Sequence, residues 1–154
     1  MNLASAEASR RLSELAAILR RTDRPEALDT TCRWLRSTFP RYRWVGVYAL
    51  HGDRLDLAAW DGPAATEHTS IPIGRGVCGR AAREGRTVIV DDVRAAPEYL
   101  ACFLETRAEI VVPIRTPDTV LGEIDIDGNQ AAAFDGSDQA FLERVAERLT
   151  AYVA

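Results

Sequence analysis

The fold is decided by the stretch Glu109–Asp127, which reads EIVVPIRTPDTVLGEIDID. Val and Ile dominate both of its halves, which indicates strands at Glu109–Ile114 and Val120–Asp127, because β-branched side chains pack well on a pleated surface. The segment Thr116-Pro117-Asp118 between them is typical of a turn. The stretch therefore predicts a β-hairpin.

A second hairpin is expected upstream of the first. Residues Arg43–Leu50 are rich in aromatic and β-branched side chains, and Arg54–Trp60 is the expected returning strand after a turn at His51-Gly52-Asp53. Shorter elements lie between the two hairpins, and we expect strands at Ser70–Ile73 and Thr87–Val90 and a helix at Gly76–Glu84 that ends at Gly85.

Helices are expected near both ends of the chain. Apolar residues recur every three or four positions in three segments, which predicts helices at Ser5–Arg21, between Pro25 and Pro40, and at Asp138–Val153. Ser137 and Asp135 are candidate N-caps for the last helix. Hairpins with helices at the chain ends favour the α+β class. We expect one domain over residues 1–154, with N-terminal helices at about 4–39, the sheet and a pocket at about 42–128, and a C-terminal helix at about 138–153.

Composition excludes several classes of partner. The chain has 154 residues and a net charge of −4, so it lacks the excess of basic residues that nucleic-acid binding requires. No apolar run approaches the ~20 residues of a membrane helix, and no signal-peptide core follows Met1. We therefore expect no nucleic-acid or membrane partner and a cytoplasmic location.

The cysteines of the chain are Cys32, Cys78 and Cys102. In a cytoplasmic protein they are expected to be free thiols, so any disulfide would be transient and chemical. Cys78 falls in the first turn of the helix expected at Gly76–Glu84, where the helix dipole favours a thiolate. Packing as a small apolar side chain is the alternative for Cys78 and the interpretation for Cys32. Cys102 lies in Asp91–Thr106, which has no clear period and is expected to be irregular and functional.

A zinc site is the first hypothesis to consider for these cysteines. Cys78 and Cys102 could ligate zinc together with His51 and His68. The sequence lacks the paired C-x-x-C or H-x-x-x-H spacing that concentrates ligands locally. We therefore expect no metal site.

One face of the last predicted strand is acidic. Period-two alternation places Glu123, Asp125 and Asp127 on the same face, opposite two isoleucines. If Pro117 centres the turn, paired residue numbers sum to 234, which puts Glu109 opposite Asp125. Carboxyls that converge in this way raise at least one pKa, so one of them could stay protonated and act as a general acid, while the remaining charge attracts an ammonium group. A solvated acidic face is the alternative.

Several motifs of the chain resemble one known family. The segments YRWVGVYAL, GRGVCGRAAREGRTVIVDDV, ACFLETRAEIVVPI and LGEIDIDG occur in the order found in the GAF-domain free methionine-R-sulfoxide reductases. The resemblance covers about the last three quarters of the chain. It implies a six-stranded antiparallel sheet flanked by helices, a closed pocket for one free amino acid, no bound cofactor, and thiol chemistry supported by thioredoxin or another external dithiol.

The resemblance also implies residue roles. Cys102 matches the attacking cysteine and Cys78 a cysteine that can form the disulfide, while the acidic substrate pocket and its aromatic wall match Glu109, Asp125, Asp127, Trp44, Tyr48 and Trp60. In this scheme the Cys102 thiolate attacks the sulfoxide sulfur of free L-methionine-(R)-S-oxide while Glu109 protonates the oxygen. Cys78 then condenses with the sulfenic acid, and a dithiol reduces the disulfide.

Three positions depart from the family pattern. His68 stands where a third, recycling cysteine is usual, Phe103 replaces an aspartate after the nucleophile, and Tyr99 replaces a histidine. Without the third thiol, Cys78 is the only candidate resolving residue. A non-catalytic GAF module that binds a small molecule or senses redox state is therefore the alternative function. A homodimer is left open.

Overall fold

The computed structural model describes residues 3–96 and 105–153. The elements follow one another as α1 (Ser5–Arg20), α2 (Ala27–Thr38), β1 (Trp44–His51), β2 (Arg54–Asp61), β3 (Ser70–Pro72), α3 (Gly76–Glu84), β4 (Val88–Val90), β5 (Ala108–Arg115), β6 (Val120–Gly128) and α4 (Gly136–Leu149), with short 3₁₀ turns at Arg24–Glu26 and Val93–Ala95. The predicted order of strands and helices is confirmed.

The strands form one antiparallel sheet. Its six strands lie in the order β3-β2-β1-β6-β5-β4, so the two predicted hairpins, β1-β2 and β5-β6, meet at the centre through the β1-β6 pair. β3 and β4, the two shortest strands, occupy the edges. The fold is α+β, as the sequence predicts.

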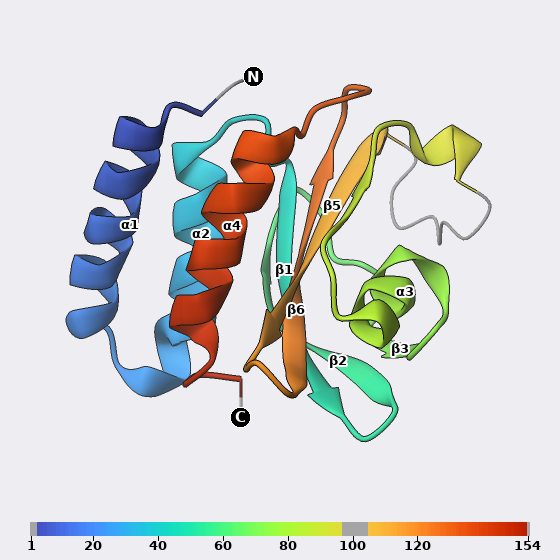
Figure 1. Cartoon of the computed structure of the whole chain (residues 1–154), viewed down its shortest axis with the longest axis horizontal. Helices are drawn as coiled ribbons and strands as arrows, with labels where there is room; N and C mark the ends of the chain where they lie inside the picture. Colours follow the sequence, from blue (N-terminus) through green and yellow to red (C-terminus); the bar gives the residue numbers. More distant parts are fainter. Residues whose placement is uncertain (1–2, 97–104, 154) are drawn as a thin grey trace.

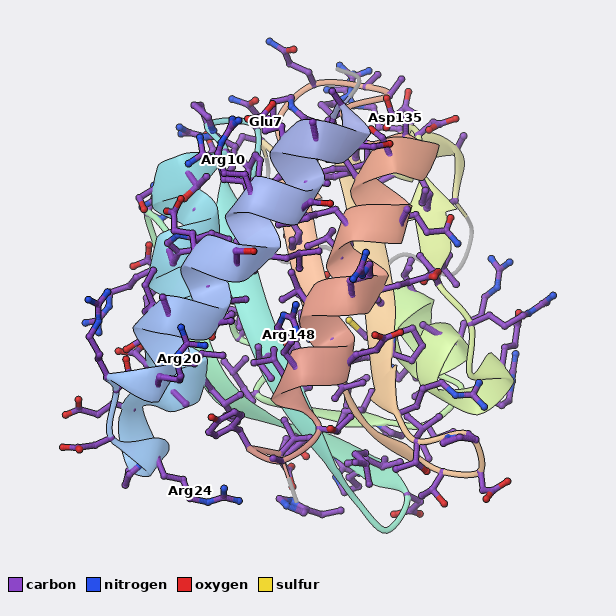
Figure 2. The ribbon with its side chains drawn as sticks, turned by 60° about the vertical axis from the view of Figure 1, so that its left-hand side comes forward. Glu7, Arg10, Arg20, Arg24, Asp135 and Arg148 are labelled. Atoms are coloured by element: carbon purple, nitrogen blue, oxygen red, sulfur yellow. The ribbon has the colours of Figure 1, made fainter. Side chains whose placement is uncertain are left out.

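Helices cover the sheet on both faces. Figure 1 shows α1, α2 and α4 stacked on one side of the sheet and α3 on the other, next to β3. α2 and α4 pack directly on the strands, and α1 packs on α2 and α4. Figure 2 shows α1 and α4 side by side in front of the sheet, with Asp135 at the N-terminal end of α4.

Side-chain alternation along the strands separates two apolar clusters. The larger one lies under α1, α2 and α4 and includes Val45, Val47, Ile124 and Ile126. The smaller one lies under α3 and includes Tyr48, Leu55, Cys78 and Val111. Because neighbouring residues of a strand point to opposite faces, the residues between the isoleucines of β6 face α3. The acidic row of β6 therefore belongs to the α3 side of the sheet.

The predicted register of the β5-β6 hairpin is wrong by two residues. Glu109 lies opposite Asp127 and Val111 opposite Asp125, so paired numbers sum to 236 and not 234. The turn spans residues 116–119, closed by a 2.9 Å hydrogen bond from the Thr116 N–H to the Thr119 carbonyl, and an irregularity after Ile114 adds one residue to β6. A shift of two leaves every side chain on its predicted face.

The predicted bounds of the C-terminal helix are also corrected. α4 begins at Gly136 because the Asp135 carboxylate accepts hydrogen bonds from the backbone N–H groups of Ser137 and Asp138, and the Asp138 side chain accepts one from the Asp135 N–H. This is a reciprocal N-terminal cap, and it selects Asp135 over Ser137 as the N-cap. The helix ends at Leu149, where the Tyr152 N–H donates to the Leu149 carbonyl and closes a turn.

Among the described residues, no helix is long and apolar enough to cross a membrane.

Candidate active site

A tight turn between β3 and α3 positions Cys78. Gly74 and Gly76 have positive φ angles of 89° and 67°, which residues with a Cβ rarely adopt. A Cβ at Gly79 would lie only 2.7 Å from the Pro72 carbonyl oxygen, so only glycine allows the helix to start this close to the strand. Cys78, in the first turn of α3, is thereby held against the sheet and is 6% exposed.

The acidic row of β6 faces Cys78 from the centre of the sheet. Glu123, Asp125 and Asp127 are 0%, 1% and 2% exposed, and Glu109 of β5 is 4% exposed. These values exclude the alternative of a solvated acidic face. The register gives Glu109 and Asp127 directly opposite places, and residues in such a pair have Cβ atoms about 4.5–5.5 Å apart.

Three of these groups converge most closely. One ligand atom each of Cys78, Glu109 and Asp125 lie within 4.8 Å of one another. Glu109 shares a hydrogen bond with Asp125. A hydrogen bond between two carboxyl groups requires a proton on one of them, so this pair is suited to hold a proton. The convergence of carboxyls predicted from the sequence is therefore present, with a thiol added to it.

Burial raises the pKa of the β6 acids. Desolvation is the largest cause for Glu123, Asp125 and Asp127, and the charge of Asp125 adds to it for the other two. Contacts with Cys78, Glu109 and Thr106, and the charge of His68 acting on Asp125, lower these pKa values in part. Among the described residues, both oxygens of Glu123 and Asp127 and one of Asp125 accept no hydrogen bond of normal geometry. The cluster thus contains buried carboxyl oxygens that a bound donor could satisfy.

Burial opposes the thiolate that the helix dipole would favour at Cys78. Burial raises the pKa of the Cys78 thiol well above its ordinary value, and the charges of Asp125, Glu123 and Glu109 raise it further. The first turn of a helix stabilises an anion by about 0.3–1 kcal/mol at exposed positions, which is small beside full desolvation among acids. Burial among acids therefore favours the neutral thiol of Cys78, in agreement with its interpretation as a packing residue.

Two tryptophans stand beside the acids. The rings of Trp44 and Trp60 are stacked, with centroids 6.3 Å apart and planes at 11°, and the Trp44 Nε1 donates to the Ala64 carbonyl at 3.2 Å. Gly46 makes room for this ring, since a Cβ there would lie 2.3 Å from the Trp44 indole. Trp44 is paired with Asp127 across β1 and β6, so it stands on the acidic face.

Tyr48 closes the same side of the sheet further along β1. Its hydroxyl donates to the His68 carbonyl at 2.8 Å, which ties the β2-β3 connection to the sheet. Tyr48 lies opposite Glu123 and is fully buried. The aromatic residues predicted for the pocket are therefore on the face that carries the acids.

Comparison with known proteins agrees with this geometry. Residues 21–154 match the GAF domain family. Free methionine-R-sulfoxide reductase of Escherichia coli is 32% identical over 127 residues, which are 82% of this chain and 76% of that protein. The chain belongs to the free methionine-R-sulfoxide reductase family of GAF domains.

Other members of this GAF-domain family support the assignment. Free methionine-R-sulfoxide reductase of Saccharomyces cerevisiae is 43% identical over 108 residues, which span 68% of this chain and 59% of the yeast protein. The structure of free methionine-R-sulfoxide reductase from Neisseria meningitidis in complex with its substrate has a TM-score of 0.87 and 35% identity, covering 99% of this chain and 93% of that one.

Other residues singled out in the sequence of this GAF domain are either outside the described residues or away from the acidic cluster. Cys102, with Tyr99 and Phe103, lies outside the described residues. Cys32 is fully buried in the larger apolar cluster on the opposite face of the sheet, as its interpretation as a packing residue predicts. His51 is exposed in the sheet and bonds Asp56 at 2.9 Å.

Two residues of the site were not given a role from the sequence. Glu123 was recognised as part of the acidic face, and its period-two spacing from Asp125 was the signal that could have added it. Thr106 is 6% exposed and interacts with Asp127, and no local pattern marks it.

A groove of about 860 Å³ lies elsewhere on the molecule. It runs along the edge strand β4 and is lined by residues that include Arg80, Arg115, Gln139 and Glu143. It shares no residue with the acidic cluster or the stacked tryptophans. The groove is therefore separate from the candidate active site.

Proposed function

We propose that this chain reduces free L-methionine-(R)-S-oxide to L-methionine with electrons from thiols. The observation that carries the proposal is the buried cluster of Cys78, Glu109, Asp125 and Asp127 in a chain related to free methionine-R-sulfoxide reductases. The electrons pass through cysteine sulfur, so the reaction needs no bound cofactor.

The substrate's α-ammonium is bound by Asp125 and Asp127. Both carboxylates are buried with oxygens that accept no hydrogen bond from the described residues, and an ammonium supplies three donors and a compensating charge. The stacked Trp44 and Trp60 rings, with Tyr48, offer an apolar wall for the methyl and methylene groups next to sulfur. A free amino acid fits these two requirements, because its ammonium and its side chain diverge from one carbon.

Cys102 acts as the nucleophile in the first step. Its thiolate sulfur bonds to the sulfoxide sulfur while Glu109 transfers its proton to the sulfoxide oxygen. The hydroxyl then moves to the cysteine sulfur, methionine leaves, and Cys102 becomes a sulfenic acid. The hydrogen bond between Glu109 and Asp125 supports Glu109 as proton donor, since that pair holds one proton.

Cys78 resolves the sulfenic acid in the second step. Its sulfur bonds to the Cys102 sulfur, its proton joins the departing hydroxyl, and water leaves. An external dithiol such as thioredoxin then reduces the Cys78–Cys102 disulfide in the cytoplasm and restores both thiols. The sum is one sulfoxide and one dithiol converted to methionine, a disulfide and water.

A coupled assay with the free R and S sulfoxides tests the proposal. With a thioredoxin system, methionine should appear from the R epimer and not from the S epimer. Cys102→Ser should abolish turnover, whereas Cys32→Ala, a change on the other face of the sheet, should keep it. Unchanged turnover in Cys102→Ser, or equal rates on both epimers, would contradict the mechanism.

A module that binds an amino acid without turnover is the second candidate function. It is favoured by the raised pKa of the buried Cys78 thiol, which makes that residue a slow nucleophile. Calorimetry with methionine distinguishes the two functions. Binding that is lost in Asp125→Asn, together with no turnover of either sulfoxide, would replace the reductase with a sensor.

A further inference from the structure

The cluster of Cys78, Glu109 and Asp125 has the composition of a metal site. It offers one thiol and two carboxyls from three different elements, α3, β5 and β6, with ligand atoms within 4.8 Å of one another. The sequence predicted no metal because it has no local ligand pairs. The three ligands come together only through the tertiary fold.

Unpartnered oxygens next to this cluster point to a cation. Asp125 is 1% exposed, and its Oδ1 accepts no hydrogen bond from the described residues. Glu123 is fully buried beside Cys78, whose thiol lowers the pKa of its carboxyl group, and neither of its oxygens accepts a hydrogen bond of normal geometry from the described residues. Within residues 3–96 and 105–153, no arginine forms an ion pair with Glu123, Asp125 or Asp127. The charge of His68 acts on Asp125 and compensates these acids in part, and buried carboxyls are costly without full compensation, so a bound cation stabilises the site.

We propose that Cys78, Glu109 and Asp125 form a binding site for Zn²⁺. Zinc accepts mixed sulfur and oxygen ligands, at about 2.3 Å for thiolate and about 2.0–2.2 Å for carboxylate. Tetrahedral coordination at these bond lengths separates ligand atoms by about 3.5 Å, so the cluster needs to contract by little more than about 1 Å. Mg²⁺ and Ca²⁺ prefer oxygen ligands alone, and the thiol therefore selects zinc over them.

Three protein ligands leave one coordination position open. In zinc sites of this kind a water or another small ligand takes the fourth position. Binding removes the thiol proton of Cys78 and the proton shared by Glu109 and Asp125, and both are released to solvent while no electrons move. The two carboxylates and the thiolate together carry one more negative charge than the zinc ion carries positive charge, so the occupied site has a net charge of −1.

Occupancy by zinc excludes the reaction proposed above. The ion takes the Asp125 carboxylate that would hold the substrate ammonium, and the Cys78 sulfur that would form the disulfide. Zn²⁺ should therefore be a reversible inhibitor, and this consequence rests on the proposed function. The binding site itself does not depend on that function, so the two can fail separately.

Metal titration of the reduced full chain tests the site. Zn²⁺ should compete with a chromophoric chelator at a stoichiometry of one ion per chain, and Cd²⁺ should produce an ultraviolet cadmium–thiolate charge-transfer band. Cys78→Ala should abolish the band and weaken Zn²⁺ binding by at least about 100-fold. Cys32→Ala removes a thiol that lies on the other face of the sheet, and it should leave both signals as in the wild type.

A second variant tests the site even if the Cys78→Ala protein does not fold. Glu109→Gln retains the thiol but removes an anionic ligand, so Zn²⁺ affinity should fall by at least about 10-fold while the cadmium–thiolate band persists at higher Cd²⁺. Undiminished Zn²⁺ affinity in either variant, or no saturable binding to the wild type, overturns the site. A ¹¹³Cd resonance that reports two thiolate ligands also overturns it, because the described cluster contains one.

Inhibition separates this site from the proposed function. If Zn²⁺ binds at Cys78 and the chain reduces the R sulfoxide, added Zn²⁺ should raise the apparent KM, and a chelator should reverse the effect. Zn²⁺ binding without any turnover in the metal-free protein keeps the site and removes the reductase. Turnover that is indifferent to saturating Zn²⁺ places the bound ion elsewhere and overturns the site.

Discussion

Replacement of Glu123 by glutamine should stabilise the protein relative to the wild type, and this difference should grow as the pH rises. Glu123 is fully buried between Tyr48 and Pro113 of the neighbouring strands, and neither of its oxygens accepts a hydrogen bond from the described residues. Desolvation raises its pKa in the folded state, with the charge of Asp125 as the second cause. Glutamine has nearly the same shape and carries no charge at any pH.

The sign of the effect follows from proton linkage. In the unfolded chain Glu123 loses its proton near its ordinary pKa of about 4.3, whereas the folded protein keeps it to a higher pH. The folded state then binds more protons than the unfolded state, so its free energy of unfolding falls as the pH increases above that value. One proton corresponds to about 1.4 kcal/mol for each pH unit, up to the folded pKa.

Urea unfolding across a pH series with a chelator present measures this difference. The free energy of unfolding of Glu123→Gln should exceed that of the wild type by the smallest amount near pH 5. This difference should grow by up to about 1.4 kcal/mol for each pH unit above pH 5. Glu147→Gln, the same change on the exposed side of α4, controls for the loss of one carboxyl and should stay within about 0.5 kcal/mol of the wild type. A difference between Glu123→Gln and the wild type that does not vary with pH would refute the reasoning.

Two further substitutions test the packing around the site, and a third tests the cap of α4. Gly46→Ala puts a Cβ 2.3 Å from the Trp44 ring, so the ring should move and stability should fall by about 1–3 kcal/mol, seen in thermal melts and tryptophan fluorescence. Gly122→Ala meets the Tyr48 carbonyl oxygen at 2.2 Å, a backbone atom of the β1-β6 pair; it should cost more than Gly46→Ala, and equal melting temperatures would contradict this. Asp135→Ala removes the cap of α4 and should cost about 1 kcal/mol by denaturant titration, whereas no change would exclude the cap as a stabilising feature.

Much of the fold follows from local sequence patterns. Aromatic and β-branched residues around turn sequences predicted the two hairpins, and the 3.6-residue spacing of apolar residues predicted the helices near the chain ends, because these patterns reflect local geometry. The error in the strand register arises where a turn and a strand irregularity act together. The turn at residues 116–119 and the irregularity after Ile114 together set the register of β5 and β6, and the sequence does not show which residue the chain leaves unpaired.

The candidate active site likewise has features that the sequence predicted and features that only the tertiary structure determined. Period-two alternation is a property of one strand, so the sequence alone placed Glu123, Asp125 and Asp127 on a common face. The expected hairpin pairing added Glu109 to that face, and the motif resemblance added Cys78 to the site. The sequence could not determine that this face is covered by α3, because burial depends on which elements pack together.

That coverage decided the chemistry of the groups. A helix N-terminus in water would favour the Cys78 thiolate, but tertiary packing removes the water and surrounds the sulfur with acids, so the thiol keeps its proton. The meeting of Cys78, Glu109 and Asp125 likewise joins residues up to 47 positions apart in the chain. Residue identity and local spacing thus determined which groups the protein carries, and long-range packing decided their distances, their solvation and therefore their protonation.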